Sequence, residues 1–170
     1  MNAVTVWQPW ASLIAIGAKR FETRGWATSY RGPIAIHAGA KRPFDTMDGA
    51  DVKVIFAMGK AFGAAEKNIR VILDFLETLP RGAVIATAEL VECWEITDIG
   101  HILDGSKSAC VEGGWTAIDF GGKSNIIYGP EILFGDWREG RYAWELANVK
   151  PLAEPISVRG RQGLWDWEER

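Results

Sequence analysis

The stretch GAKRFETR, residues 17–24, joins a predicted helix to a predicted strand. Gly17 is suited to end the helix, because glycine readily adopts the left-handed conformation that often follows a helix. In the second half of the stretch, charged and uncharged residues alternate, which is the two-residue period of a strand. The side chains of Glu22 and Arg24 should therefore lie on one face of that strand, with Lys19 at the corner between helix and strand.

This arrangement of charges has a functional and a structural interpretation. A carboxylate between two cations ionises readily, and a lysine that is desolvated beside another cation can act as a base or a nucleophile. Alternatively, the same residues form a surface ion pair that contributes about 0–1 kcal/mol to stability. The pattern of residues alone leaves both interpretations open.

The neighbouring residues predict further short elements. Residues 4–7 have the pattern of a strand, and Pro9 is suited to the first turn of a helix, where its missing N–H would be unpaired. Apolar residues at helical spacing follow it. Beyond the quoted stretch, a turn at 31–33 leads into a second predicted strand at 34–37.

The rest of the chain predicts a helical insert and several more strands. The insert, at about 44–80, holds two helices, the second stopped by Pro80. A long β-branched run at 83–96 predicts a central strand, whereas residues 97–125 show no clear pattern beyond a short helix near 99–103. Further strands are predicted at 131–134, 141–149, 156–158 and 163–167. We therefore expect an α+β fold, a small curved β-barrel with surrounding helices, in one domain over residues 1–170.

The net charge of the chain is –3, from 19 basic and 22 acidic side chains. This balance argues against a general polyanion binder, whose affinity rests on many phosphate contacts. The charge is unevenly distributed, because residues 1–43 carry six basic side chains and one acidic side chain, a net charge of +5. That segment either presents a local anion-binding face or is simply a solvated surface.

Other sequence features narrow the possible functions. Cys93 and Cys110 are too few for a disulfide framework and lack metal-ligand spacing, so we expect reduced thiols in a cytoplasmic protein. We also expect neither a signal peptide nor a membrane span. Phosphate-binding glycine loops and zinc-protease motifs are also missing, so no cofactor or metal is expected. His37, in an apolar strand, is more simply explained as a structural histidine than as a catalytic one.

The spacing G-x-K-x-x-E-x-R in residues 17–24 resembles the signature of the ASCH family (activating signal cointegrator-1 homology), within the PUA-like superfamily. Residues 7–11 and 30–38 resemble segments that flank this motif in bacterial and phage members. Residues 83–91 resemble the middle strand of the family, and residues 142–145 resemble a late strand. The resemblance implies a PUA-like β-barrel with a cleft lined by the motif, and it implies RNA, single-stranded nucleic acid or a modified nucleoside as the partner.

The resemblance also implies candidate catalytic residues. Some small bacterial ASCH proteins are amidohydrolases that deacetylate N4-acetylcytidine with a lysine, a threonine and a glutamate, and another bacterial member is a ribonuclease. By position, the lysine corresponds to Lys19, and Glu22 stands where the amidohydrolases have the threonine. The distal glutamate corresponds to Glu89. The candidate catalytic residues are thus Lys19, Glu22 and Glu89, although the missing threonine argues against the same deacetylation mechanism.

The tryptophans and the basic residues near the motif supply the candidate ligand-binding groups. A tryptophan at the mouth of a charged cleft would stack on a nucleobase, a contact worth about 1–3 kcal/mol. The tryptophans in strand-like segments, at 94, 137, 144, 165 and 167, are expected in the core. The candidate ligand-binding residues are Trp7, Gln8, Trp10, Arg24, Arg31 and Lys41.

Three functions are compatible with these patterns. The first is a nucleic-acid- or nucleotide-binding domain with its ligand in the motif cleft. The second is a hydrolase, either an amidohydrolase for an acylated nucleoside or a ribonuclease, that uses Lys19. The third is a protein-interaction module in which the motif only braces the fold and the 44–80 insert docks a partner. The sequence does not indicate an oligomeric state.

Overall fold

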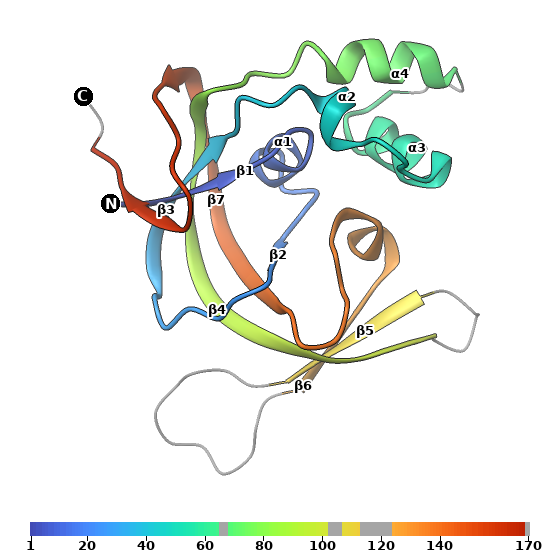
Figure 1. The fold of residues 1–170 in the computed structure, drawn as a ribbon, viewed down its shortest axis with the longest axis vertical. Coiled ribbons are helices and arrows are strands. Elements are labelled where there is room, and N and C mark those ends of the chain that lie inside the picture. Colours follow the sequence, from blue (N-terminus) through green and yellow to red (C-terminus); the bar gives the residue numbers. More distant parts are fainter. Residues whose placement is uncertain (65–67, 102–106, 113–123, 169–170) are drawn as a thin grey trace. The chain divides into compact units, whose positions relative to one another are not determined.

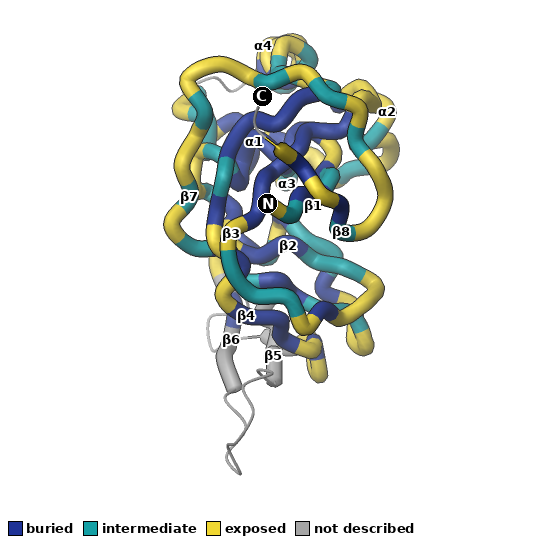
Figure 2. Tube along the Cα trace, turned by 90° about the vertical axis from the view of Figure 1, so that its left-hand side faces the viewer, coloured by how far each residue is buried: buried dark blue, intermediate teal, exposed yellow. Residues whose placement is uncertain are grey.

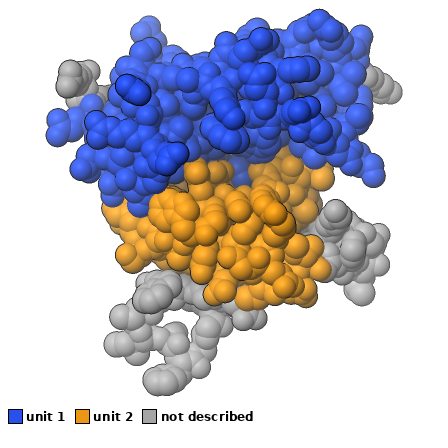
Figure 3. Space-filling view, in the orientation of Figure 1, with its two compact units in different colours: residues 1–19, 33–88, 148–170 blue, residues 20–32, 89–147 orange. Residues whose placement is uncertain are grey.

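The structure, a computed structural model, describes residues 1–64, 68–101, 107–112 and 124–168 (Figure 1). The contacts within the chain divide it into two compact units, which Figure 3 shows in different colours. Unit 1 comprises residues 1–19, 33–88 and 148–170, and unit 2 comprises residues 20–32 and 89–147.

Three strands of unit 1 lie side by side. β1 (Asn2–Val6) pairs in parallel with β3 (Gly32–Ala38) and antiparallel with β8 (Leu164–Asp166). Residues 34–38 of β3 are all buried and are dark blue in Figure 2. A strand with consecutive buried residues is covered on both faces. The strands predicted at 4–7, 34–37 and 163–167 are thus confirmed to within a residue or two.

The helices of unit 1 follow the prediction in part, because the insert contains the two predicted helices and a third, short helix, α2, that was not predicted. α1 (Trp10–Ala15) directly follows Pro9, and the 44–80 insert contains α2 (Pro43–Thr46), α3 (Val52–Ala61) and α4 (Ile69–Leu76). The side chains of Asp51 and Asn68 cap α3 and α4, because each accepts a hydrogen bond from a backbone N–H in the first turn of its helix. α3 and α4 lie side by side in Figure 1. Their close approach needs Gly59, since a Cβ there would lie 2.8 Å from Cδ1 of Ile72.

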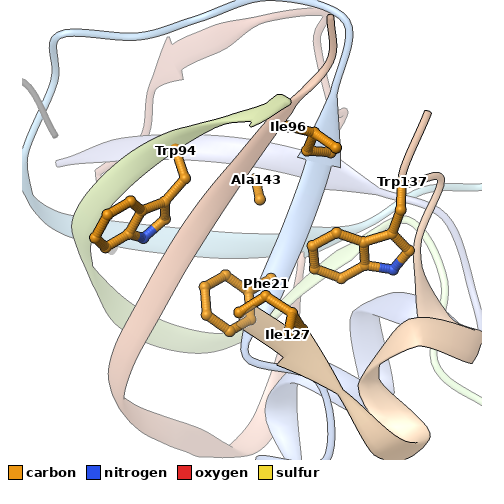
Figure 4. Close-up of a cluster of buried hydrophobic side chains, with 6 residues drawn as sticks. All are labelled: Phe21, Trp94, Ile96, Ile127, Trp137 and Ala143. Atoms are coloured by element: carbon orange, nitrogen blue, oxygen red, sulfur yellow. The ribbon is translucent and has the colours of Figure 1, made fainter. Parts of the chain in front are cut away.

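Unit 2 is built on β2 (Phe21–Arg24), which pairs antiparallel with β7 (Tyr142–Ser157). β4 (Ala83–His101) pairs with β5 (Lys107–Glu112), and β5 pairs with β6 (Ser124–Tyr128). A cluster of buried side chains fills this unit (Figure 4): Phe21, Trp94, Ile96, Ile127, Trp137 and Ala143. The tryptophans expected in the core of the chain are all buried: Trp94, Trp137, Trp144, Trp165 and Trp167.

The order of the strands confirms the α+β class. It runs β2-β7-β4-β3-β1-β8, with β5 and β6 branching from β4, and it mixes parallel and antiparallel pairs. β2 and β8 end this order, and no pairing joins them among the residues that the structure describes. The sheet is therefore not closed, and the PUA-like β-barrel is not confirmed. The single domain over 1–170 also stays a prediction.

Several predictions for the second half of the chain are wrong in detail. Residues 131–134, predicted as a strand, belong to the 3-10 helix η1 (Gly129–Phe134). Its buried residues, Glu131 and Phe134, are three positions apart, which is the repeat of a 3-10 helix. The strands predicted at 141–149 and 156–158 are one strand, β7. The helix expected near 99–103 does not form at 99–101, which end β4, and residues 102–106 lie outside the described part of the chain.

In the described residues, no helix is both long and apolar enough to cross a membrane.

Candidate functional site

The first half of the quoted stretch belongs to unit 1. Gly17 has a positive φ of 75°, as expected after a helix, and its N–H donates to the carbonyl of Ile14 at 2.8 Å. The N–H of Lys19 then donates to the carbonyl of Leu13 at 3.0 Å. The side chain of Lys19 is 1% exposed, although lysines are almost never fully buried. Because burying an ammonium group is costly, Lys19 is not an ordinary surface lysine.

The second half of the stretch belongs to unit 2 and carries an ion pair. Nη2 of Arg24 lies 3.1 Å from Oε1 of Glu22, which confirms that the two side chains share a face of β2. Glu22 lies opposite Trp144 in the register with β7. The guanidinium carbon of Arg24 is 6.0 Å from the centroid of the Trp144 ring, so the cation also contacts an aromatic face.

Two acceptors that the sequence analysis missed hold β2 in place. The carboxylate of Glu131, on η1, accepts the backbone N–H groups of Arg20 and Phe21 at 3.1 Å. The hydroxyl of Thr23 accepts the backbone N–H of Asp136 at 2.9 Å. These partners lie more than 100 positions apart in the sequence, so no local pattern could have revealed them.

Arg31, predicted to bind ligand, braces the turn before β3. Its guanidinium donates to Oε1 of Glu92 through Nε at 3.1 Å and through Nη2. It also donates to the backbone carbonyls of Thr28 and Tyr30, at 2.9 and 2.8 Å. These four hydrogen bonds fix the side chain within unit 2. Glu89, the predicted distal glutamate, is exposed on β4.

Gln8 is completely buried in unit 1 and its amide is hydrogen-bonded to the protein. Nε2 donates to the carbonyl of Pro80 and to the hydroxyl of Ser12, both at 2.7 Å, and Oε1 accepts the N–H of Ser12 at 3.0 Å. The amide thus ties the start of α1 to Pro80, the last residue of the helical insert. Trp10, at the first position of α1, is partly buried.

Two other predicted ligand-binding residues, Trp7 and Lys41, lie together in unit 1. Nζ of Lys41 is 4.5 Å from the centroid of the Trp7 ring, and the Trp7 side chain is 50% exposed. Both line a pocket of about 400 Å³, formed by the ends of β1 and β3 and by residues 158–162. Its other lining residues are Thr5, His37, Gly39, Ala40, Gly82, Val158, Arg159, Gly160, Arg161 and Gln162.

The pocket is basic, because its lining includes Lys41, Arg159 and Arg161 and, among the described residues, no acidic side chain. Burial lowers the pKa of His37 below the usual range, which favours its neutral form, although a hydrogen bond to Val158 partly offsets this effect. Nε2 of His37 lies 3.0 Å from the carbonyl of Val158, so Nε2 carries the proton. Nδ1 is buried without a hydrogen-bond partner in the described structure.

Within each unit, the described structure brings some of the predicted site residues together. Trp7 and Lys41 share the unit 1 pocket, and Glu22 and Arg24 form the ion pair of unit 2. A joint catalytic role for Lys19, Glu22 and Glu89 stays a prediction. Within the described residues, no group of three or more His, Cys, Asp or Glu side chains is arranged to hold a metal ion.

Comparison of the sequence with known proteins identifies a family and two relatives. The model of the ASCH domain matches residues 4–156. Activating signal cointegrator 1 from Homo sapiens is 30% identical over 90 residues, which are 53% of this chain and 14% of the human protein. The protein of the same name from Mus musculus is 30% identical over 86 residues, which are 51% of this chain and 13% of the mouse protein. The matches thus span a small part of these relatives.

Proposed function

Because the chain belongs to the ASCH domain family, we propose that it binds nucleic acid, with single-stranded RNA or a modified nucleoside as the ligand. The observation that carries this proposal is the half-exposed Trp7 ring beside the Lys41 ammonium, in a basic pocket. An exposed aromatic ring stacks on any nucleobase, and a cation beside it attracts the neighbouring phosphate. The net charge of –3 favours such a local site over a long phosphate-binding track.

The proposal is tested by the anisotropy of a short fluorescent single-stranded RNA titrated with the protein. We expect Trp7→Ala to weaken binding by about 5- to 150-fold, the equivalent of one lost base stack. Lys41→Gln should weaken binding. It should also make the slope of log K against log salt concentration less steep by about 0.7 for each lost phosphate contact.

Two matched variants serve as controls. Phe44→Ala removes an aromatic side chain that is 62% exposed on α2, and Lys60→Gln removes an exposed lysine on α3. Neither should change the affinity. The proposal is wrong if RNA does not bind saturably, or if Trp7→Ala binds as tightly as Phe44→Ala while both variants keep their melting temperatures.

A second candidate function is hydrolysis, and the complete burial of Lys19 favours it. A desolvated lysine can serve as a general base or a nucleophile. In such a reaction, Glu22 or Glu89 would orient groups or relay protons, and Arg24 would stabilise developing negative charge. Such chemistry would act on an acylated nucleoside or on RNA.

Product analysis distinguishes hydrolysis from binding alone. The protein is incubated with N4-acetylcytidine and, separately, with RNA, and the products are separated. Lys19→Met keeps the length of the side chain without its charge, so thermal melting can show whether the variant folds. Turnover that disappears in folded Lys19→Met supports a catalytic lysine, whereas turnover that persists in this variant rejects the role of Lys19.

A further inference from the structure

We propose that the pocket of unit 1 binds the phosphate group of a single nucleotide, free or at the end of a strand, while the base of that nucleotide stacks on Trp7. This inference rests on the proposed function and makes it specific, because a phosphorylated nucleotide would then be preferred over an unphosphorylated one. The residues assigned to the phosphate are Lys41, Arg159 and Arg161.

The charge environment of the pocket arginines separates them from the others. Ten arginines lie in the described part of the chain, and eight of them have a carboxylate oxygen within 4.0 Å: Arg20, Arg24, Arg31, Arg42, Arg70, Arg81, Arg138 and Arg141. The two exceptions are Arg159 and Arg161, both in the pocket. Their positive charges are therefore not compensated by a carboxylate of the described chain, which suits them to an anionic ligand.

The backbone that carries these arginines is held firmly on both sides of Gly160. The N–H of Val158 donates to the carbonyl of Gly82 at 3.0 Å, and the carbonyl of Val158 accepts from His37. The hydroxyl of Thr5 donates to the carbonyl of Arg161 at 2.9 Å. A site with a fixed backbone loses less entropy when a ligand binds. Arg159 and Arg161 thus start from a preorganised segment, although their side chains are exposed.

The Trp7 ring is also supported from one side. A Cβ on Gly39 would lie 2.9 Å from Cδ1 of Trp7, so the ring packs closely against the backbone at Gly39. Lys41 lies two residues further along and contacts the ring through its ammonium group. A base stacked on Trp7 would therefore have its own phosphate close to Lys41.

The size of the pocket limits the ligand. About 400 Å³ is at the small end of the range of roughly 300–1,000 Å³ typical of small-molecule sites. A single nucleotide fits this volume, whereas a strand would extend beyond it. Guanidinium groups pair well with the oxygens of a phosphate, and a terminal phosphate has more negative charge than one within a strand. These properties point to a phosphorylated end or a free nucleoside monophosphate.

The test compares short RNA strands of one sequence that carry a 5′-phosphate, a 3′-phosphate or hydroxyl groups at both ends. A strand one nucleotide longer with hydroxyl ends controls for the added phosphate charge. Affinities are measured by calorimetry, together with those of nucleosides and nucleoside monophosphates. We expect the wild type to prefer one phosphorylated end by about tenfold, the magnitude of one charge-assisted contact.

The variants identify the residues responsible. The double variant Arg159→Gln/Arg161→Gln should lose the preference for phosphate and still bind the hydroxyl strand. Arg70→Gln, which removes an exposed arginine of α4 paired with Asp74, should keep the preference. Equal affinity of the wild type for phosphorylated and hydroxyl strands would overturn the inference and leave the proposed function intact. A preference for phosphate that survives in the double variant would have the same two consequences. If no strand binds, the proposed function fails as well.

Discussion

The backbone N–H of Arg20 points between the two carboxylate oxygens of Glu131 and lies 3.1 Å from each. The N–H of Phe21 lies at the same distance from Oε1. β2 lies at one end of the strand order and pairs only with β7 in the described chain. An edge strand has unpaired backbone groups that need other partners. Glu131 is such a partner, and it fixes the backbone that directly follows Lys19.

We therefore expect Glu131→Gln to lower the free energy of unfolding by about 1–3 kcal/mol. The substitution replaces one acceptor oxygen with an NH₂ group, so a donor would face the N–H of Arg20. Urea unfolding measures the change, and Glu139→Gln, at an exposed position, is the matched control. If both variants unfold at the same urea concentration as the wild type, the contact does not stabilise β2.

The sequence predicted the local features of this region because their causes are local. The two-residue period of the strand placed Glu22 and Arg24 on one face, and their side chains form an ion pair at 3.1 Å. The conformational freedom of glycine predicted the end of the helix at Gly17, which has a positive φ. Each of these predictions depends on residues only a few positions apart.

The contacts that the sequence could not predict join distant segments. Glu131 is 111 positions from Arg20, and the apolar residues of its segment are also compatible with the strand predicted at 131–134. No motif marks Arg159 and Arg161 in the sequence, and their place in the pocket with Trp7 depends on the hydrogen bonds of Val158 and Thr5 to distant segments. The burial of Lys19 likewise arises from tertiary packing.

An isosteric substitution that adds a charge at the buried Gln8 should destabilise the protein. Gln8→Glu replaces the donor that binds the carbonyl of Pro80 at 2.7 Å with an acceptor. We expect a loss of about 1–3 kcal/mol or more in the free energy of unfolding, because a buried carboxylate would be left facing a carbonyl oxygen. Gln162→Glu makes the same change at an exposed position and should have little effect. Equal stabilities of the two variants would contradict the structural role of Gln8.

His37 should make the stability of the protein depend on pH. Burial lowers the pKa of His37 in the folded state, whereas the unfolded chain keeps a pKa of about 6.5. As the pH falls through that value, the unfolded state takes up a proton that the folded state resists, so the free energy of unfolding decreases until the folded pKa is reached.

The chain has two histidines, so His101→Gln leaves His37 as the only one. Between pH 7.5 and pH 5.5, the free energy of unfolding of this variant should fall more than that of His37→Gln/His101→Gln. Urea unfolding at several pH values measures the difference. Parallel pH profiles of the two proteins would show that the pKa of His37 is not lowered on folding.

Cys93 should be an unreactive thiol. It is 3% exposed, and burial, the largest influence, raises its pKa above the usual range, while the N–H of Thr28 and the charge of Arg31 oppose this shift. The thiolate is the reactive form, so a raised pKa and a buried sulfur both slow its reactions. In Cys110→Ser, a disulfide reagent at pH 8 should modify Cys93 only as fast as the protein unfolds, and fully after denaturation. Rapid modification of the native variant would contradict the burial of this thiol.

Gly160 should be necessary for the shape of the unit 1 pocket. A Cβ at this position would lie 2.4 Å from Cε1 of His37 and 2.8 Å from the hydroxyl oxygen of Thr5. The buried imidazole is rigid and hydrogen-bonded to Val158, so it cannot move away easily. We expect Gly160→Ala to cost about 1–3 kcal/mol of stability, as overpacking does, and to weaken the preference for a phosphorylated nucleotide.

Gly25→Ala is the matched control for this substitution. The nearest atom to a Cβ at Gly25 is Nη1 of Arg141 at 3.6 Å, an ordinary van der Waals contact. The control should therefore keep both the melting temperature and the affinity for phosphorylated RNA, measured by the same calorimetry as the wild type. If Gly160→Ala matches this control in both properties, the backbone at Gly160 does not set the position of Arg159 and Arg161, and the preorganised phosphate site loses its structural basis.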